Sequence, residues 1–566
     1  MNVKDLIAAA IMAAARQAMV DGVFAETELP AVMLEVPPQK EFGDFATNFA
    51  MQLARVAKTK PRQLAEAITS CLNSRAALDK NHPDALSWLR EAKIAGPGFI
   101  NFYLKSDWLY DLLHFVLVQG ENYGRTTTGG GEKIQVEFVS ANPTGPLHVG
   151  HGRGAAVGSA LVNLLRAAGY DVQAEYYIND AGNQMENLAA SVNARYLEIM
   201  GVETVFPENG YHGQDIIATA QRIIDQGGAK YLELPTNERL AIFKELALTE
   251  KLALLKEDLE SFGVSFDKWF SERTIHDNGA IEATCQKLKA SGHIYEQDGA
   301  LWLKSTAYGD DKDRVVVRDN GVPTYLAADI AYHRDKFVRG FDRLINIWGS
   351  DHHGYISRVK AAVAAMGFEP ERLEVLILQM VSLYQNGELV KMSKRTGRSV
   401  TLAELIEEVG CDAARFFFIM RSIDSQLDFD LDLAKSRSNE NPVYYIQYAH
   451  ARINSIFRQT QEAGIKMPQL ADISLNQLTS EAEVELIKKI GEYPEEIALA
   501  AKERAPHHMA RYAHELAGLF HSFYNQCRII GVEPELQAAR LALVTAVQNT
   551  LRSVLGILGI TAPDRM

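Results

Sequence analysis

The stretch IQVEFVSANPTGPLHVGHG occupies residues 134–152 and indicates the fold of the region around it. Its opening run, Ile134 to Val139, has the apolar, β-branched character of a strand and leads into a turn rich in proline and glycine. Helix-like residues 154–168 and strand-like residues 172–178 follow. This alternation predicts an α/β fold, with a parallel sheet joined by crossover helices.

The turn has the features of a phosphate site. A glycine-bearing turn between the carboxyl end of a parallel strand and a helix presents backbone N–H groups and the positive end of the helix dipole. Gly150 and Gly152 have no side chain to obstruct a nucleotide, so we expect it to approach the backbone closely there. His148 and His151 are expected to donate hydrogen bonds to phosphate oxygens.

Two other interpretations of these histidines remain open. They could ligate a metal ion, with Asp351, His352 or His353 completing the site from a distant part of the chain. They could also have only a structural role in the turn. Histidine spacing alone does not separate the three interpretations.

The 566 residues exceed the length that one hydrophobic core usually serves, and their pattern divides into three zones. Residues 1–105 mix helical segments with turns and predict a small α/β domain. Residues 106–440 carry the strand–helix alternation. Beyond the polar junction 436–442, residues 441–566 predict an all-α helical bundle, whose packing stripe includes Leu543, Val544, Val547, Leu551, Val554, Leu555 and Leu558.

Composition narrows the class of protein. A formal net charge of -14 argues against indiscriminate nucleic-acid binding over the whole surface, so any RNA contact must be local. The four cysteines show neither metal-ligand spacing nor a disulfide framework, which indicates a reducing cytosol. The apolar run 6–15 continues through Arg16 and Gln17 as an amphipathic helix would. Because no apolar stretch approaches the length of a bilayer span, we expect no membrane association.

A second motif follows the strand-like run 375–383: residues 390–397 read VKMSKRTG. Lysines on both sides of Met392 and Ser393 suit a polyphosphate whose bridging oxygen gains negative charge during displacement. A solvated charge run is the plain alternative. The presence of this string alongside the first motif favours the functional interpretation.

The two motifs, His148-Val149-Gly150-His151 and Lys391-Met392-Ser393-Lys394, together resemble the signatures of the class I aminoacyl-tRNA synthetases. Their separation, 391 minus 148 or 243 residues, suits two halves of one Rossmann-like fold divided by inserted material. Residues 137–147, 177–184, 325–332 and 349–354 narrow the resemblance to the arginyl-tRNA synthetases of bacterial type. The resemblance covers essentially the whole chain.

The resemblance implies that ATP activates L-arginine to arginyl-adenylate and that the terminal ribose 2′-hydroxyl of tRNA(Arg) takes the arginyl group. Mg2+ is expected to accompany ATP, with no metal site in the protein itself. His148 and His151 would face the phosphates, and Lys391 and Lys394 would hold the departing pyrophosphate. The implied ATP-binding residues are Asn142, Pro143, Thr144, Gly145, His148, Gly150, His151, Lys391, Met392, Ser393 and Lys394.

Arginine specificity calls for acidic side chains, because a guanidinium is planar, permanently charged and best met by carboxylates. The resemblance nominates Asp329 and Glu137 for this role, with Tyr325 beside the group. It gives Asn142 the α-amino group and Asp351 a supporting contact. Lysine would be refused because its ammonium lacks the forked geometry. On residue chemistry alone, Asp329 would more often be a surface or helix-capping residue.

By the same resemblance the N-terminal zone contacts tRNA and the C-terminal zone binds the anticodon. Tyr448, Arg452 and Met566 are the RNA contacts expected there, although aromatic residues at helical spacing usually build a core. The chain has Gln537-Ala538-Ala539-Arg540 where the family has the Asp-Ala-Leu-Arg string that names this domain. A cytoplasmic monomer is expected.

Three alternatives stand beside this interpretation. The glutaminyl, glutamyl and cysteinyl synthetases would share the ATP machinery. A noncatalytic RNA-binding paralogue is a different class of answer, and the intact histidines and lysines of both signatures argue against it. A metal-dependent hydrolase is the weakest of the three.

Overall fold

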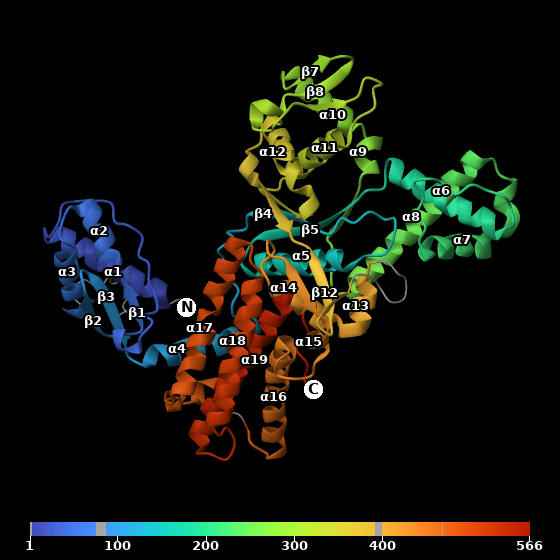
Figure 1. Ribbon diagram of the computed structural model, residues 1–566. Helices are drawn as coiled ribbons and strands as arrows, with labels where there is room; N and C mark the ends of the chain where they lie inside the picture. The colour runs from blue at the N-terminus through green and yellow to red at the C-terminus, as the bar shows by residue number, and fades with distance from the viewer. Residues whose placement is uncertain (1–2, 75–86, 391–398, 467) are drawn as a thin grey trace. The chain divides into compact units, whose positions relative to one another are not determined.

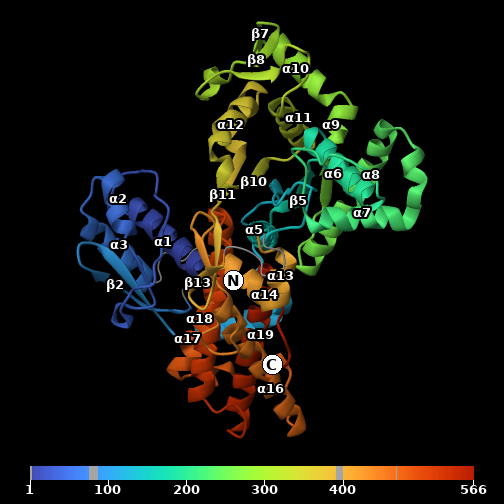
Figure 2. The ribbon, with the colours of Figure 1, turned by 45° about the vertical axis from the view of Figure 1, so that its right-hand side comes forward.

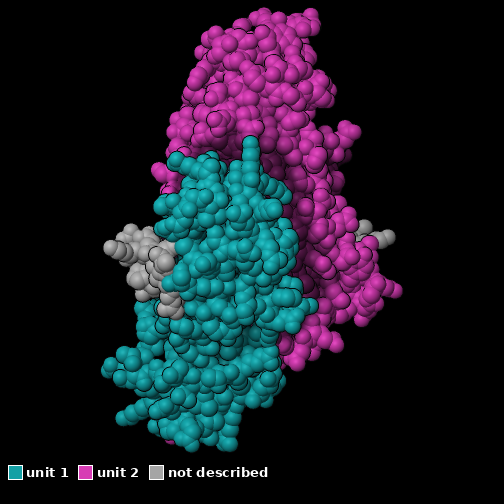
Figure 3. Space-filling view, turned by 90° about the vertical axis from the view of Figure 1, so that its left-hand side faces the viewer, with its two compact units in different colours: residues 1–120, 464–491, 522–547 teal, residues 121–463, 492–521, 548–566 magenta. Residues whose placement is uncertain are grey.

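The computed structural model describes residues 3–74, 87–390, 399–466 and 468–566. The chain forms two compact units, distinguished by colour in Figure 3. Unit 1 comprises residues 1–120, 464–491 and 522–547, and unit 2 comprises residues 121–463, 492–521 and 548–566. Each unit is described by itself below.

Unit 1 begins with a small α/β arrangement. Helices α1 (Val3–Val20), α2 (Phe49–Ala57) and α3 (Pro61–Ser74) accompany an antiparallel sheet of order β1-β3-β2. Its strands are β1 (Phe45–Thr47), β2 (Leu89–Ala95) and β3 (Phe99–Leu104), and α4 (Asp107–Gln119) follows. The amphipathic helix predicted over residues 6–15 is confirmed as part of α1, which buries Ile7, Ile11, Ala14 and Ala18.

Unit 2 is built on a five-stranded sheet, to which the strands labelled β4 and β5 in Figure 1 belong. The order is β11-β10-β4-β5-β6 and every pairing is parallel. The strands are β4 (Lys133–Glu137), β5 (Asp171–Ile178), β6 (Lys268–Ser271), β10 (Arg343–Gly349) and β11 (Leu373–Leu378). The predicted parallel sheet is therefore confirmed, and its carboxyl edge is where side chains from several strands can meet.

Helices and two insertions join these strands. α5 (Val149–Ala167) connects β4 to β5. Three helices, α6 (Asn183–Ile199), α7 (Gln214–Gly227) and α8 (Thr236–Ser261), lie between β5 and β6 in the chain and pack around their own core (Figure 2). Between β6 and β10 lie α9 (Arg273–Asp277), α10 (Ala280–Ala290), the antiparallel strands β7 (Ile294–Gln297), β8 (Ala300–Leu303) and β9 (Arg314–Val317), and α11 (Tyr325–Val338).

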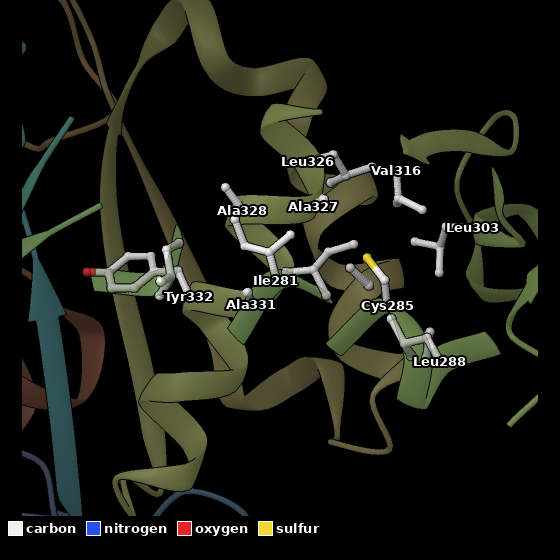
Figure 4. Packing of buried hydrophobic residues seen from close by; sticks show 14 of the residues in the cluster. Ile281, Cys285, Leu288, Leu303, Val316, Leu326, Ala327, Ala328, Ala331 and Tyr332 are labelled. Atoms are coloured by element: carbon white, nitrogen blue, oxygen red, sulfur yellow. The ribbon is translucent and has the colours of Figure 1, made fainter. Parts of the chain in front are cut away.

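Helix α11 is held from two directions. Its apolar residues Leu326, Ala327 and Ala331 pack into a cluster with Ile281 and Cys285 of α10, as Figure 4 shows. Toward the sheet, its polar residues contact three neighbouring strands, which are described with the site below. This double attachment fixes the helix that carries the predicted arginine-binding residues.

The strand-like run 375–383 was predicted as one apolar segment, and the structure divides it. Residues up to Leu378 belong to β11 of the parallel sheet, whereas β12 (Val381–Gln385) pairs with β13 (Glu388–Val390) and β14 (Leu427–Asp430) in a separate sheet. At the break, the N–H of Gln379 donates to the carbonyl of Ile423 at 3.0 Å. The fully buried Arg153 donates to the carbonyl of Gln379 at 2.8 Å. These contacts end the hydrogen bonding of this segment with the parallel sheet.

The C-terminal part is helical, as predicted. Residues 441–566 contain α16 (Pro442–Glu462), α17 (Glu481–Glu503), α18 (His507–Gln526) and α19 (Pro534–Leu558). The shorter helices α12 (Ile356–Ala365), α13 (Leu402–Val409), α14 (Cys411–Ile419) and α15 (Leu431–Lys435) precede them, in the zone of strand–helix alternation. All seven apolar stripe residues named above are fully buried. By length and composition α19 alone, among the helices of the described ranges, could cross a membrane, and 67% of its apolar window is buried inside the protein, as in a core helix.

Candidate active site

The turn after β4 has a strained backbone. Val139 and Ser140 have φ angles of 67° and 39°, in the left-handed region that a β-branched residue rarely adopts. Neighbouring strand β5 holds the turn in place, since the hydroxyl of Tyr176 donates to the carbonyl of Ala141 at 2.8 Å. The N–H of Tyr177 donates to Oγ of Ser140 at 3.1 Å. Such strain persists where surrounding contacts determine the conformation, which is typical of ligand-binding turns.

The residues predicted to bind ATP follow this turn directly. Asn142 is exposed, Pro143 is buried, and Thr144 and Gly145 are partly exposed. The N–H of Thr144 donates to the carbonyl of Asn142 at 2.8 Å, which folds the segment back on itself. The turn therefore brings exposed and partly exposed groups to the start of α5.

His148 is the residue that caps the N-terminus of α5. Its Nδ1 accepts from the N–H of Gly150 at 3.1 Å, and Nδ1 of His151 accepts from the N–H of His148 at 3.4 Å. The two rings stack with their centroids 3.7 Å apart. Because a neutral imidazole that accepts at Nδ1 carries its proton on Nε2, each ring keeps Nε2–H as a donor.

Both histidines are held in the neutral form. Desolvation lowers the pKa of His148 below its usual value. Desolvation, with a smaller contribution from His148, lowers the pKa of His151 to about 3. At neutral pH the pair can therefore donate hydrogen bonds to a phosphate without adding positive charge to the helix end.

We expected Gly152 to lack a side chain so that a nucleotide could approach the backbone, and this expected reason was wrong. A Cβ at this position would meet Cδ1 of Leu402 at 2.7 Å and the ring of Phe418 at 3.2 Å, so the missing side chain makes room for protein. At Gly150 a Cβ would meet the His148 ring at 3.0 Å. The glycines allow close packing inside the motif, because helix α5 lies against the segment that follows the second motif.

The first motif pairs through backbone hydrogen bonds with residues 400–402. The N–H of Leu402 donates to the carbonyl of Leu147 at 2.8 Å, and the N–H of Val149 donates to the carbonyl of Val400 at 3.2 Å. The predicted lysines, Lys391 and Lys394, with Met392 and Ser393, lie outside the described residues. The segment just after them is thus paired with the first motif.

Asp329 and Tyr325 lie one turn apart on α11, and therefore share a face of that helix. Tyr325 is 60% exposed. Oδ2 of Asp329 accepts a hydrogen bond of 2.5 Å from the hydroxyl of Tyr355. Desolvation raises the pKa of Asp329 to about 7; the Tyr355 hydrogen bond opposes this shift, and the nearby carboxylates Glu272 and Glu137 add to it. A carboxylate in this setting favours a cationic ligand.

Glu137 lies at the end of β4 and has a different environment. Its Oε2 is 2.6 Å from Nζ of the fully buried Lys336, and its Oε1 accepts from Ser140 at 3.1 Å. Lys336 also donates to Asn346 of β10 at 3.1 Å. The charge of Glu137 is thus compensated within the protein, whereas Asp329 has no ion pair among the residues that the structure describes.

A row of polar residues crosses three strands beneath α11. Asn346, Glu137 and Glu175 are paired in register on β10, β4 and β5. Three residues of α11 contact this row, and Lys336 is one of them. The hydroxyl of Tyr332 donates to Glu175 at 2.7 Å, and Nη1 of Arg339 is 2.6 Å from Glu175. Sequence reasoning missed this network. The feature that could have predicted the network is the presence of polar residues at equivalent positions of neighbouring buried strands.

Two further residues of the site were missed. Glu272, directly after β6, is 5% exposed, and its carboxylate raises the pKa of Asp329. Burial and the nearby Glu272 carboxylate raise the pKa of Tyr177 of β5, and its ring packs at a tilt against Tyr332 with centroids 4.5 Å apart. Asp351, by contrast, is exposed in the 3-10 turn Ser350–Tyr355 after β10. The interior of the site is therefore more acidic than the sequence indicated.

In the described ranges, no group of three or more histidine, cysteine or acidic side chains is arranged to hold a metal ion. In the site itself, Nδ1 of both His148 and His151 already accepts a backbone hydrogen bond. All four cysteines are free thiols.

The residues predicted to contact RNA lie on the helical part of the chain. Arg452 stacks over the Tyr448 ring at 4.5 Å and donates to its hydroxyl at 3.0 Å. Its other terminal nitrogen is 3.1 Å from Nδ1 of His521. Met566 is 53% exposed. Tyr448 and Arg452 thus form one half-buried cluster on α16.

The altered string at 537–540 is also explained locally. Arg540 forms an ion pair of 2.7 Å with the buried Glu483 and donates to the carbonyl of Arg528 at 2.6 Å. Oε1 of Gln537 accepts from the N–H of Gly531 at 2.9 Å. Glutamine can therefore hold this loop through its side-chain oxygen.

The chain matches three protein families along its length. Residues 113–419 match the family described as tRNA synthetases class I (R), catalytic domain. Residues 1–104 match the arginyl tRNA synthetase N terminal domain, and residues 446–566 match the DALR anticodon binding domain. The parallel sheet and the histidine-capped helix thus belong to a class I aminoacyl-tRNA synthetase catalytic domain.

Whole-chain relatives agree with this class. The chain is 55% identical to the arginine–tRNA ligase of Carboxydothermus hydrogenoformans over 542 residues, which covers 96% of this chain and 95% of the relative. It is 52% identical to that of Desulforamulus reducens, with 100% and 99% covered. The solved Thermus thermophilus arginyl-tRNA synthetase shares the fold, with a TM-score of 0.72 at 23% identity over 98% of this chain and 99% of that one. The chain belongs to the arginine–tRNA ligase family.

Proposed function

We propose that the protein uses ATP to activate L-arginine and transfers the arginyl group to the 3′ end of tRNA(Arg) in the cytoplasm. The observation that carries this proposal is a combination at one edge of the parallel sheet. Two neutral histidines cap α5, the segment after the second motif pairs with the first, and an uncompensated carboxylate lies on α11.

In the activation step, the arginine carboxylate attacks the α-phosphate of ATP and pyrophosphate leaves. Nε2–H of His148 and of His151 donates to phosphate oxygens as their negative charge is redistributed. Residues 142–145 and Gly150 line the nucleotide, and Lys391 and Lys394 bind the departing pyrophosphate. No protein nucleophile takes part, so the rate acceleration rests on alignment and on charge stabilisation.

Mg2+ is proposed to arrive with ATP. This ion prefers six oxygen ligands and is usually held by substrate phosphates and water, so it needs no dedicated protein cage. When bound, it neutralises negative charge on the phosphates. The residues of the chain then have to orient the nucleotide and the amino acid.

Arginine is recognised by its forked cation. Asp329 accepts N–H groups of the guanidinium, and the exposed ring of Tyr325 lies one helical turn away, beside the group. Glu137 adds negative potential from β4, and Asn142 and Asp351 contact the amino-acid end of the substrate. Lysine presents a point charge that leaves part of the carboxylate unpaired, so it is bound less tightly.

The enzyme acts as a monomer. The remaining parts of its chain bind the RNA. Residues 1–105 contact the body of the tRNA, and residues 441–566 bind its anticodon. The cluster of Tyr448 and Arg452 offers an aromatic face and a cation to an unpaired base, and Met566 adds an apolar contact.

Pyrophosphate exchange with a panel of all twenty amino acids, with and without tRNA(Arg), tests the proposal. We expect exchange with arginine alone, and the two conditions show whether tRNA must bind before activation. Exchange that depends on glutamine, glutamate or cysteine would replace the specificity proposed here. No exchange with any amino acid, together with tight tRNA binding, would identify a noncatalytic RNA-binding protein.

A further inference from the structure

Asp329 is held by one tyrosine. Tyr355 ends the turn after β10, and its hydroxyl donates to Oδ2 of Asp329 at 2.5 Å. Within the described ranges, Oδ1 of Asp329 accepts no hydrogen bond and neither oxygen faces an ion-pair partner within 4.0 Å. The carboxylate therefore has a fixed oxygen and a free one.

The second acidic residue of the site cannot replace it. Both oxygens of Glu137 are engaged, Oε2 by Lys336 and Oε1 by Ser140. If Glu137 turned from Lys336 to a ligand, the buried ammonium of Lys336 would be left unpaired, which costs free energy in a low-dielectric interior. The main acceptor for an incoming guanidinium is thus Asp329.

The ring of Tyr355 is itself firmly placed. It packs against the apolar cluster that anchors α11 and α10, and the Arg358 guanidinium lies over it at 4.6 Å. Trp348 of β10 approaches its edge with centroids 6.1 Å apart. A hydroxyl carried on a ring held in this way sets the direction of its acceptor.

We infer that Tyr355 is a positioning residue for amino-acid selection: its hydroxyl orients the Asp329 carboxylate so that Oδ1 and the second lone pair of Oδ2 meet the two N–H groups of a guanidinium fork. The inference rests on the proposed function. A carboxylate free to rotate still attracts any cation, but it loses the planar alignment that a guanidinium needs and an ammonium does not. Tyr355 therefore favours arginine over lysine.

The test is Tyr355→Phe in the full chain, assayed by aminoacylation with tRNA(Arg). Loss of a hydrogen bond to a charged group should raise the KM for arginine about tenfold to a hundredfold. We expect kcat and the KM for ATP to stay within about twofold, because the phosphate site is untouched. The ratio of kcat/KM for arginine to that for lysine should fall.

The pH dependence provides a readout that a packing role would not move. The Tyr355 hydrogen bond lowers the pKa of Asp329 against the opposing effects of Glu137 and Glu272, while Lys336 lowers it further. Tyr177 and Arg358 are the other titratable groups facing this carboxylate and its tyrosine partner. The acidic limb of kcat/KM for arginine should therefore move to higher pH in Tyr355→Phe.

Tyr308→Phe is a matched control. Tyr308 packs against the same apolar cluster and its hydroxyl is 2.7 Å from Nδ1 of His293, away from Asp329. It should leave the arginine KM and the pH profile unchanged. An unchanged arginine KM in Tyr355→Phe, or equal losses for arginine and ATP in both variants, overturns the inference. Wild-type protein that charges no arginine overturns the proposed function itself.

Discussion

The backbone N–H of Leu402 donates a 2.8 Å hydrogen bond to the carbonyl of Leu147, so two segments far apart in the sequence meet at the start of α5. Leu402 also fills the space that a side chain at Gly152 would need. The second motif ends just before this junction. The contributions proposed for the helix-capping histidines and for the lysine-rich motif can be tested separately.

Lys394→Ala should slow the formation of arginyl-adenylate by about 100-fold, the scale of losing one charge-stabilising donor. The arginine KM should change little, since the role proposed for this lysine is binding of pyrophosphate. Rapid-quench single-turnover assays measure the rate. Lys230→Ala, which removes an exposed lysine of the helical insertion, is the control and should be silent. A wild-type single-turnover rate in Lys394→Ala would remove the second motif from the chemistry.

His151→Ala should lower the same rate by about 100-fold to 1,000-fold, because one preorganised donor to the phosphate is lost. The proton on Nε2 can be observed directly. Nitrogen-15 NMR of wild-type protein should report His151 as neutral with Nδ1 unprotonated from pH 6 to pH 8, since its pKa is lowered to about 3. A charged His151 signal in that range contradicts the assignment.

Arginine binding should weaken as the pH falls below about 7. Asp329 has a pKa raised to about 7 by desolvation, so its carboxylate is lost to protonation below that value, and only the ionised form attracts the guanidinium. The KM for arginine should then rise about tenfold for each further pH unit. Pyrophosphate exchange between pH 5.5 and pH 8.5 measures this limb, while the KM for ATP serves as the internal control.

Asp329→Asn should abolish the pH dependence of the arginine KM below pH 7. It should also lower kcat/KM for arginine by at least about 100-fold. The amide keeps the size of the side chain and removes its charge. The measurement is arginine-dependent exchange at several pH values with protein of unchanged circular dichroism. Wild-type kcat/KM in this variant would show that another residue anchors the guanidinium.

Lys336→Met should destabilise unit 2 by about 3–5 kcal/mol, because it leaves Glu137 buried without its cation. Urea unfolding followed by tryptophan fluorescence measures the loss. Lys289→Met removes an exposed ion pair with Glu296, 3.1 Å long, and should have little effect. Equal stabilities for both variants would mean that the buried pair contributes no more than a surface pair.

Much of the architecture followed from local patterns. Alternating strand and helix runs predicted the parallel sheet, and the apolar stripe of α19 predicted a core helix, since these periodicities are properties of neighbouring residues. The division of residues 375–383 between two sheets was missed. At the division the buried guanidinium of Arg153, on α5, donates to the carbonyl of Gln379, and a contact from a remote segment leaves no local signal.

The sequence by itself determined the phosphate motifs, the acidic candidates and the family resemblance, because each depends on residue types in a fixed order. Only the tertiary structure decided which acid is available: Lys336 neutralises Glu137, while Asp329 keeps one free oxygen and a raised pKa. It also revealed Glu272, Tyr177 and Tyr355. Charge compensation and desolvation depend on distances between segments remote in the chain, and those distances exist only after folding.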